Sequence, residues 1–157
     1  MNTITLMRYP GGKAKIYKTV KKIIEANGLS NRIYVEPFAG GFGLGLKLML
    51  NKDVKHFIIN DYDYHIYALW FSVFHHTEEL IEKIITTRVS LVEWHFQKEV
   101  YQNYSNKSLL EIGFSTLFLN RTNFSGILNA RPMGGINQKG KYKIDCRFNK
   151  KTMIEYI

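Results

Sequence analysis

The sequence predicts an α/β fold that opens as a doubly wound sheet and then turns helical, and three observations support this. Two short apolar stretches flank a glycine-rich turn and an apolar helix, in the order strand, turn, helix, strand. Helix-capping signals then recur through the middle of the chain. Turn residues and clustered lysines fill the last part. At 157 residues, 45% of them hydrophobic, the chain has the length of one domain and can bury a sizeable core.

The first elements follow from local patterns. Apolar residues recur with helical spacing over residues 13–27, and Gly28 supplies a C-terminal stop. We expect Arg32–Glu36 to form a short buried strand and Leu44–Leu50 to form the helix after the glycine turn. Lys55–Asp61 is the second expected strand, and it ends on a carboxylate.

Several helices are expected next. Tyr64–Phe74 is an apolar, aromatic helix, and Thr77 is expected to cap the helix after it. Ser90 and Ser108 are each followed three residues later by glutamate, which is the capping-box spacing that opens a helix. Successive capped helices indicate a helical insertion rather than further β/α units.

The last third of the chain differs from the helical middle. Phe124–Phe148 contains turn residues, short apolar patches and lysines, and it is expected to form a β-hairpin or an ordered loop. We therefore divide the chain into residues 1–75, with the sheet and the glycine turn, and residues 76–157, with the helical insertion and this basic segment.

The net charge of +9 is unevenly distributed. Residues 1–50 carry +6, residues 51–100 carry −3, and residues 101–157 carry +6. Two basic blocks around an acidic middle indicate a positive face, which attracts a polyanion such as a nucleic-acid backbone. A solvated face without a partner is the alternative.

Composition also bears on the compartment. The single cysteine, Cys146, excludes an internal disulfide and favours a reducing cytosol. No stretch of about 18 apolar residues predicts a membrane span, and the N-terminus lacks the apolar core of a signal peptide. We therefore expect a cytoplasmic protein.

The glycine-rich turn carries the first chemical signal. Glycines at 40, 41, 43 and 45 lie between a strand and a helix, where the backbone can approach a ligand closely. Asp61 ends the next strand about 20 residues later, where a carboxylate accepts hydrogen bonds from ribose hydroxyls. The pair predicts a nucleoside-type cofactor, and a tight turn without a ligand is the alternative. The phosphate-loop pattern Gly-x-x-x-x-Gly-Lys-Ser/Thr is absent.

Two further segments carry polar groups suited to ligands. Gly11, Gly12 and Lys13 precede the first helix and form a candidate anion-binding turn, although a helix-opening turn with a solvated lysine is the alternative. Phe118–Gly126 presents amide, guanidinium and hydroxyl groups of the kind that contact base edges and phosphates. Eight basic residues lie within 120–151, opposed only by Asp145, and a helix end followed by a soluble loop is the bland interpretation.

These segments together resemble a known family. Arg-Tyr-Pro-Gly-Gly-Lys at 8–13, Val-Glu-Pro-Phe-Ala-Gly-Gly at 35–41, Asn-Asp at 60–61 and Asn-Arg-Thr at 120–122 are similar to the ordered signature of Dam-type DNA adenine-N6 methyltransferases. The resemblance spans nearly the whole chain. It implies the start of a Rossmann-like, S-adenosylmethionine-dependent sheet, with a helical and β-hairpin insertion that recognises double-stranded DNA. It also leaves room for a cognate restriction enzyme as a partner.

The resemblance assigns roles to residues. Residues 1–75 would form the cofactor-binding part, and its S-adenosylmethionine contacts would be Tyr9, Gly12, Lys13, Glu36, Phe38, Gly40, Gly41, Gly43 and Asp61. Residues 76–157 would read the target, with DNA contacts at Asn120, Arg121, Thr122, Asn123, Ser125, Arg131, Lys139 and Lys141. Arg131–Gly135 departs from the form seen in relatives that read GATC, so no target sequence is carried over.

One family motif is missing. The catalytic Asp-Pro-Pro-Tyr follows the recognition region in such enzymes, but Pro10, Pro37 and Pro132 are the only prolines and none is adjacent to another. In the family this motif holds the amino group of a flipped adenine. We therefore expect an N-terminal segment without catalytic residues. The alternatives are a subunit of a split methyltransferase, completed by a second polypeptide, and a non-catalytic DNA-binding module.

A metal site is not expected. His75 and His76 are adjacent, but no nearby cysteine completes a site, and they are interpreted as a solvated helix end.

Overall fold

The computed structural model describes residues 5–8 and 11–157, and these form two compact units. Unit 1 contains Thr5 and residues 11–62, whereas unit 2 contains Leu6–Arg8 and Asp63–Ile157. The sequence suggested a division after residue 75. The structural division lies earlier, because α3 (Tyr64–His75) packs along α6 (Leu109–Thr122) and therefore belongs to the helical unit.

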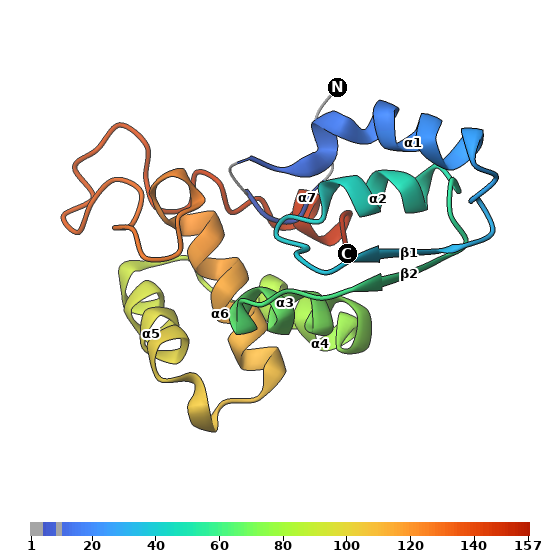
Figure 1. Cartoon of the computed structure of the whole chain (residues 1–157). Helices are drawn as coiled ribbons and strands as arrows, with labels where there is room; N and C mark the ends of the chain where they lie inside the picture. Colours follow the sequence, from blue (N-terminus) through green and yellow to red (C-terminus); the bar gives the residue numbers. More distant parts are fainter. Residues whose placement is uncertain (1–4, 9–10) are drawn as a thin grey trace. The chain divides into compact units, whose positions relative to one another are not determined.

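Unit 1 has the predicted order of strand, turn, helix and strand (Figure 1). A short 3-10 helix, η1 (Lys13–Ile16), leads into α1 (Tyr17–Ala26), and then come β1 (Ile33–Glu36), α2 (Gly43–Leu50) and β2 (His56–Ile59). The strands pair in parallel with Ile33 opposite His56 and Glu36 opposite Ile59.

The core of unit 1 is small. Ile24 of α1 packs with Leu44 and Leu48 of α2 and with Val54, and the Tyr34 ring lies against this cluster. Gly28 ends α1 with a φ of 63°, a left-handed conformation that glycine adopts without steric cost, and this confirms the predicted stop. The sheet of unit 1 thus rests on two helices whose apolar residues were visible in the sequence.

Unit 2 is built around α6, which is buried from Ile112 to Asn120. The other elements of the unit are α3, α4 (Thr77–Thr86), α5 (Leu91–Gln102), η2 (Tyr104–Asn106), η3 (Phe124–Gly126) and α7 (Lys150–Ile154). Helices α3, α4 and α5 each contact α6, and α7 contacts α4. Within the described part of the chain, no helix has the length and apolarity needed to cross a membrane.

The capping predictions have mixed outcomes. Ser108 and Glu111 form the complete capping box at the start of α6, and the Ser90 hydroxyl accepts a hydrogen bond from the Glu93 amide. Thr77 was wrongly expected to cap α4. The helix begins at Thr77, but His76 is its N-cap residue, and the Thr77 hydroxyl donates to the Val73 carbonyl of the preceding helix instead.

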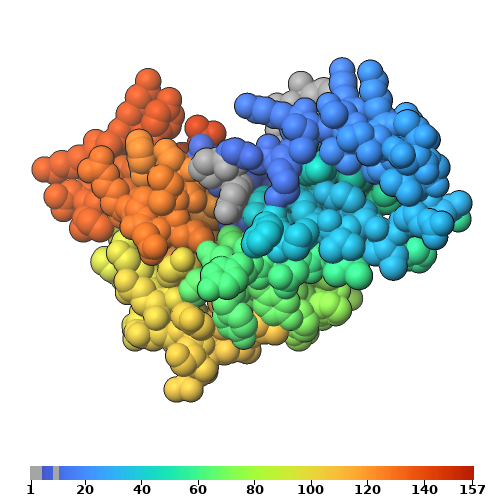
Figure 2. Space-filling view, in the orientation of Figure 1, coloured from blue at the N-terminus to red at the C-terminus, as the bar shows by residue number. Residues whose placement is uncertain are grey.

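The expected β-hairpin in Phe124–Phe148 is wrong, and the alternative of an ordered loop is correct. Among the described residues, the only pairing in this stretch is an isolated antiparallel bridge between Asn123 and Pro132. Pro132 cannot donate to a ladder, and Gly134 and Gly135 have positive φ values of 80° and 75°, so the backbone turns instead of extending. The segment lies at the surface of unit 2, where Figure 2 shows it in orange and red.

Candidate functional site

The carboxyl ends of the two strands in unit 1 bring the predicted cofactor residues together. Backbone pairing continues past both strands, since the Asn60 amide donates to the Glu36 carbonyl (3.0 Å) and the Ala39 amide donates to the Asn60 carbonyl (2.9 Å). Asp61 therefore lies beside the glycine turn, as expected for neighbouring parallel strands.

The glycine turn is fixed to Asp61 directly. The Gly40 amide donates to Asp61 Oδ2 at 2.7 Å, and Gly40 has a left-handed φ of 50°. Phe42, at φ 49°, caps the start of α2, and its buried ring lies so close to Gly45 that a Cβ atom there would clash with it. Gly40 thus meets a conformational need, whereas Gly45 meets a packing need.

Lys13 and Glu36 contact each other. Glu36 is 3% exposed, its Oε1 lies 3.0 Å from Lys13 Nζ, and its Oε2 accepts from the Tyr34 hydroxyl at 2.9 Å. Burial raises the pKa of Tyr34, and the negative charge of Glu36 raises it further. Lys13 also donates to the Phe38 carbonyl, so η1 is tied to the turn that follows β1.

The other predicted cofactor residues have different surroundings. Gly12 is exposed as the residue before η1, and Phe38 presents a side chain that is 66% exposed. Gly41 and Gly43 are buried in the turn, and the Gly41 carbonyl accepts from the Thr5 hydroxyl at 2.6 Å. Tyr9 lies outside the described residues. The structure thus brings Lys13, Glu36, Gly40 and Asp61 together at the ends of the two strands. Contact of these residues with a cofactor stays a prediction.

Asn120, predicted to contact DNA, is 1% exposed and binds protein groups. Its Oδ1 accepts from the Arg8 amide at 2.8 Å, and its Nδ2 donates to the carbonyls of Arg8 (3.1 Å) and Gly126 (2.8 Å). Asn120 therefore joins the N-terminal segment and η3 to the end of α6. In this structure the Asn120 side chain supports the fold, and its contact with DNA stays a prediction.

Thr122 and Asn123 are likewise 0% exposed. The Thr122 hydroxyl donates to the Phe118 carbonyl. Asn123 Oδ1 accepts from Trp94 Nε1 at 2.6 Å, and its Nδ2 donates to the carbonyls of Ile127 and Leu128. Neither side chain is available to a base in this structure, and both support the loop that follows α6.

Arg121 is half-buried beside the N-terminal segment. Its Nη2 donates to the Leu6 carbonyl. Burial lowers the pKa of the Arg121 guanidinium, the nearby charge of Arg8 lowers it further, and Tyr156 acts in the opposite direction. This guanidinium anchors Leu6–Arg8 to α6.

The remaining predicted DNA residues are exposed, namely Ser125, Arg131, Lys139 and Lys141. Two of them accompany exposed aromatic rings. The Arg131 guanidinium lies 5.9 Å from the centre of the Phe124 ring, and Lys141 Nζ lies 5.7 Å from that of Tyr142. The exposed surface of this segment thus combines positive charge with rings, a combination typical of nucleic-acid-binding surfaces.

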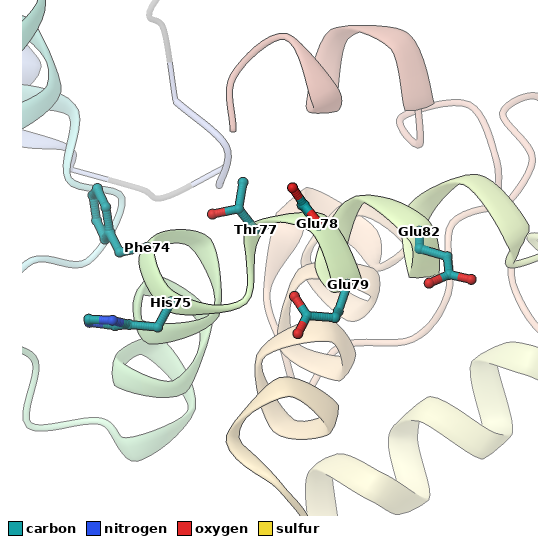
Figure 3. A pocket seen from close by; sticks show the side chains of 6 residues that line it. All are labelled: Phe74, His75, Thr77, Glu78, Glu79 and Glu82. Carbon is teal, nitrogen blue, oxygen red and sulfur yellow. The ribbon is translucent and has the colours of Figure 1, made fainter.

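A pocket on α3 and α4 is acidic, in contrast to the basic segment (Figure 3). It is lined by Phe74, His75, Thr77, Glu78, Glu79 and Glu82. The three carboxylates point in different directions in Figure 3, and their charge opposes phosphate binding. No cluster of three metal-ligating side chains occurs among the residues that the structure describes, and His76 pairs with Glu79 at 3.5 Å.

Sequence reasoning missed two side chains that organise unit 2. Trp94 donates to Asn123 from 29 residues away, and no local pattern indicates that contact. Gln138 binds three backbone groups between Met133 and Ile144. Its only sequence signal was its position between Gly135 and Gly140.

Comparison with known proteins adds one finding. A family model described as D12 class N6 adenine-specific DNA methyltransferase matches residues 9–157. That range includes both the glycine turn of unit 1 and the basic segment of unit 2. None of the curated proteins compared with the chain matches it.

Proposed function

We propose, since the chain belongs to the D12 class N6 adenine-specific DNA methyltransferase family, that unit 1 binds S-adenosylmethionine and unit 2 binds the DNA substrate. The family predicted from the sequence motifs is confirmed. When bound, S-adenosylmethionine supplies an electrophilic methyl group to adenine N6. The chain's own groups would bind and orient the two reactants.

The observation that carries the cofactor proposal is the hydrogen bond from the Gly40 amide to Asp61 Oδ2. This bond fixes the glycine turn and the acidic residue at adjacent strand ends, where such folds hold a nucleoside. Asp61 would accept from the ribose hydroxyls. The exposed Phe38 ring would provide an apolar contact, and Lys13 would keep Glu36 and the turn in place.

Titration calorimetry with S-adenosylmethionine tests the cofactor site. Asp61→Asn removes the charge but keeps an oxygen that can accept from the Gly40 amide, so it should weaken binding about tenfold, or about 1.4 kcal/mol. Asp63→Asn is the matched control, because asparagine also caps α3 and the same charge is lost two residues away. Equal affinities of the two variants, or no binding by the unaltered chain, would count against the proposal.

The DNA proposal rests on the exposed groups at Ser125, Arg131, Lys139 and Lys141. Lysine and arginine neutralise phosphates and release counterions, so duplex affinity should fall steeply as salt rises. Arg131→Ala should weaken binding and reduce that dependence. The salt dependence of fluorescence anisotropy with a labelled duplex is the measurement, and binding that ignores salt contradicts the proposal.

We further propose that the chain alone transfers no methyl group, because it has no Asp-Pro-Pro-Tyr to hold adenine N6. A subunit of a split enzyme, completed by a second polypeptide that carries the motif, is one candidate for its role. A non-catalytic DNA-binding module, whose DNA affinity S-adenosylmethionine would not change, is the other candidate. Transfer of labelled methyl to a mixed-sequence duplex by the chain alone would refute the proposal. The cytoplasmic location predicted from the sequence stays a prediction.

A further inference from the structure

The segment from Met133 to Ile144 is organised around one side chain, Gln138. Its Nε2 donates to the carbonyls of Met133 and Gly135, both at 2.7 Å. Its Oε1 accepts from the Ile144 amide at 2.9 Å. A single amide group therefore joins the two ends of the segment to its middle.

The backbone conformation of Gln138 is unfavourable for glutamine, and the side-chain hydrogen bonds stabilise it. Its φ of 48° is left-handed, and this conformation costs glutamine free energy that glycine would not pay. A turn that required only this backbone conformation would favour glycine or asparagine. The three side-chain hydrogen bonds offset the cost, and they need the length of glutamine as well as its amide.

Other contacts close the same segment. The Gly140 amide donates to the Gly134 carbonyl at 3.2 Å, and Lys143 Nζ donates to the Gln138 carbonyl at 2.5 Å. At Gly134, with φ 80°, a Cβ atom would lie 2.7 Å from the Tyr142 carbonyl oxygen. The backbone near Gly134 thus lies so close to the backbone near Gly140 and Tyr142 that there is no room for a side chain at Gly134.

The closed segment carries two exposed lysines, Lys139 and Lys141, on either side of Gly140. Lys143 donates to the Gln138 carbonyl, whereas Lys141 Nζ lies over the exposed Tyr142 ring. Two ammonium groups on a fixed backbone lose less conformational freedom on binding a polyanion than two on a mobile loop.

We propose that Gln138 is a positioning residue, which holds Lys139 and Lys141 for contacts with phosphates of the DNA backbone. The inference rests on the proposed DNA binding by unit 2, and it assigns part of that binding to a side chain that touches no DNA. Without Gln138 the lysines would still carry their charge, but they would lie on a loop that must be ordered during binding.

Two variants and one control test the geometry. Gln138→Met keeps the shape of the side chain and removes all three hydrogen bonds. Gln138→Asn keeps the amide and tolerates a left-handed backbone, but it is one methylene too short to reach. Each should lower affinity for a mixed-sequence duplex about tenfold. The salt dependence should stay nearly unchanged, because both lysines keep their charge and release the same counterions once bound. The exposed neighbour Asn137→Ala should change neither quantity.

A thermodynamic cycle separates positioning from a general loss of structure. In a Lys139→Ala/Lys141→Ala background, Gln138→Met should cause no further loss of DNA affinity, because the groups that it positions are gone. Faster amide hydrogen exchange at Ile144 in the Gln138→Met variant should report the lost hydrogen bond directly.

Each outcome has one meaning. Unchanged affinity in Gln138→Met, or an equal loss of affinity in the Lys139→Ala/Lys141→Ala background, would overturn the inference while the proposed DNA binding stands. If the unaltered chain binds no duplex, the proposed function fails and the inference fails with it.

Discussion

At the scale of single residues, buried amides attach the irregular backbone of unit 2 to the end of α6. Asn120 supplies an acceptor and a donor to the backbone of Arg8, as the neighbouring strand of a sheet would. Asn123 does the same for the indole of Trp94 and for the backbone after η3. Side chains with both donor and acceptor groups suit this task, because irregular backbone must find partners when it is buried.

Asn120→Ala should therefore destabilise unit 2 strongly. The change leaves the Arg8 amide and the carbonyls of Arg8 and Gly126 without their partner, and we expect a loss of about 2–4 kcal/mol in the free energy of unfolding. Urea unfolding followed by tryptophan fluorescence measures it, because Trp94 lies in this unit. Ser125→Ala, in the exposed turn, is the control and should stay within about 0.5 kcal/mol. Equal stability of the two variants would contradict the supporting role of Asn120.

His65 should make the stability of unit 2 depend on pH. Its ring stacks on Tyr101 with centres 3.9 Å apart, and burial lowers the pKa of His65, while Asp63 partly opposes that shift. The folded protein therefore binds this proton less tightly than the unfolded chain does. Stability is complete above about pH 6.5, the ordinary histidine value, and falls as the pH drops below it.

Melting temperatures between pH 7.5 and pH 5 measure this dependence. His65→Phe keeps an aromatic ring for Tyr101 and removes the titrating group, so its melting temperature should fall less at acid pH. Tyr101→Phe keeps the stacking and the histidine, and it should behave as the unaltered chain. Parallel pH profiles for His65→Phe and the unaltered chain would show that another group causes any acid sensitivity.

At the scale of elements, the contact between α3 and α6 depends on Gly113. A Cβ atom there would lie 2.6 Å from the Ala68 carbonyl oxygen of α3 and would also clash with the Ser72 hydroxyl. That hydroxyl donates to the Ala68 and Leu109 carbonyls, so neither neighbour can move away without breaking a buried hydrogen bond. Glycine in the middle of a helix is thus the condition for the close packing of the two helices.

Gly113→Ala should destabilise unit 2 although alanine is the better helix former. Alanine gains about 1 kcal/mol in helix propensity, whereas overpacking costs about 1–3 kcal/mol and more where backbone must shift. We expect a net loss of about 1–2 kcal/mol in urea unfolding. Val92→Ala, at a position of α5 that is 82% exposed, is the control and should be neutral or slightly stabilising. A Gly113→Ala variant more stable than the original would disprove the packing argument.

Elements that depend on neighbouring residues were predictable from the sequence. The order of strand, turn, helix and strand, the stop at Gly28 and the capping box at Ser108 all depend on residues a few positions apart. Thr77 also fits a capping pattern, but the preceding helix offers its hydroxyl the Val73 carbonyl, which the pattern does not reveal. Asn120 was expected to contact DNA because of its amide group and its place in the Asn-Arg-Thr motif of the family. Its partner Arg8 lies 112 residues away, and residue type alone does not report burial.

At the scale of the whole molecule, the sheet of unit 1 leaves apolar surface uncovered. The sheet has two strands in the described part of the chain, so each has an unpaired edge. Ile33, Val35 and Ile58 are 58%, 54% and 54% exposed, and alternate side chains of both strands form this face. Parallel strands are normally covered on both faces, and exposed apolar strands with free edges tend to associate.

We therefore expect the purified chain to self-associate as its concentration rises, and two substitutions should reduce this tendency. Val35→Thr with Ile58→Thr keeps β-branched side chains, which suit strands, and makes the exposed face polar. Light scattering over a concentration series measures association, and binding of a hydrophobic dye measures the apolar face. Ile85→Thr is the matched control, because Ile85 is also 54% exposed but lies on α4. If it reduces association as much as the sheet substitutions, or if the unaltered chain stays monomeric throughout, the sheet face is not the cause. If self-association falls in the strand variant but not in Ile85→Thr, the association surface lies on the sheet that carries Glu36 at the end of β1.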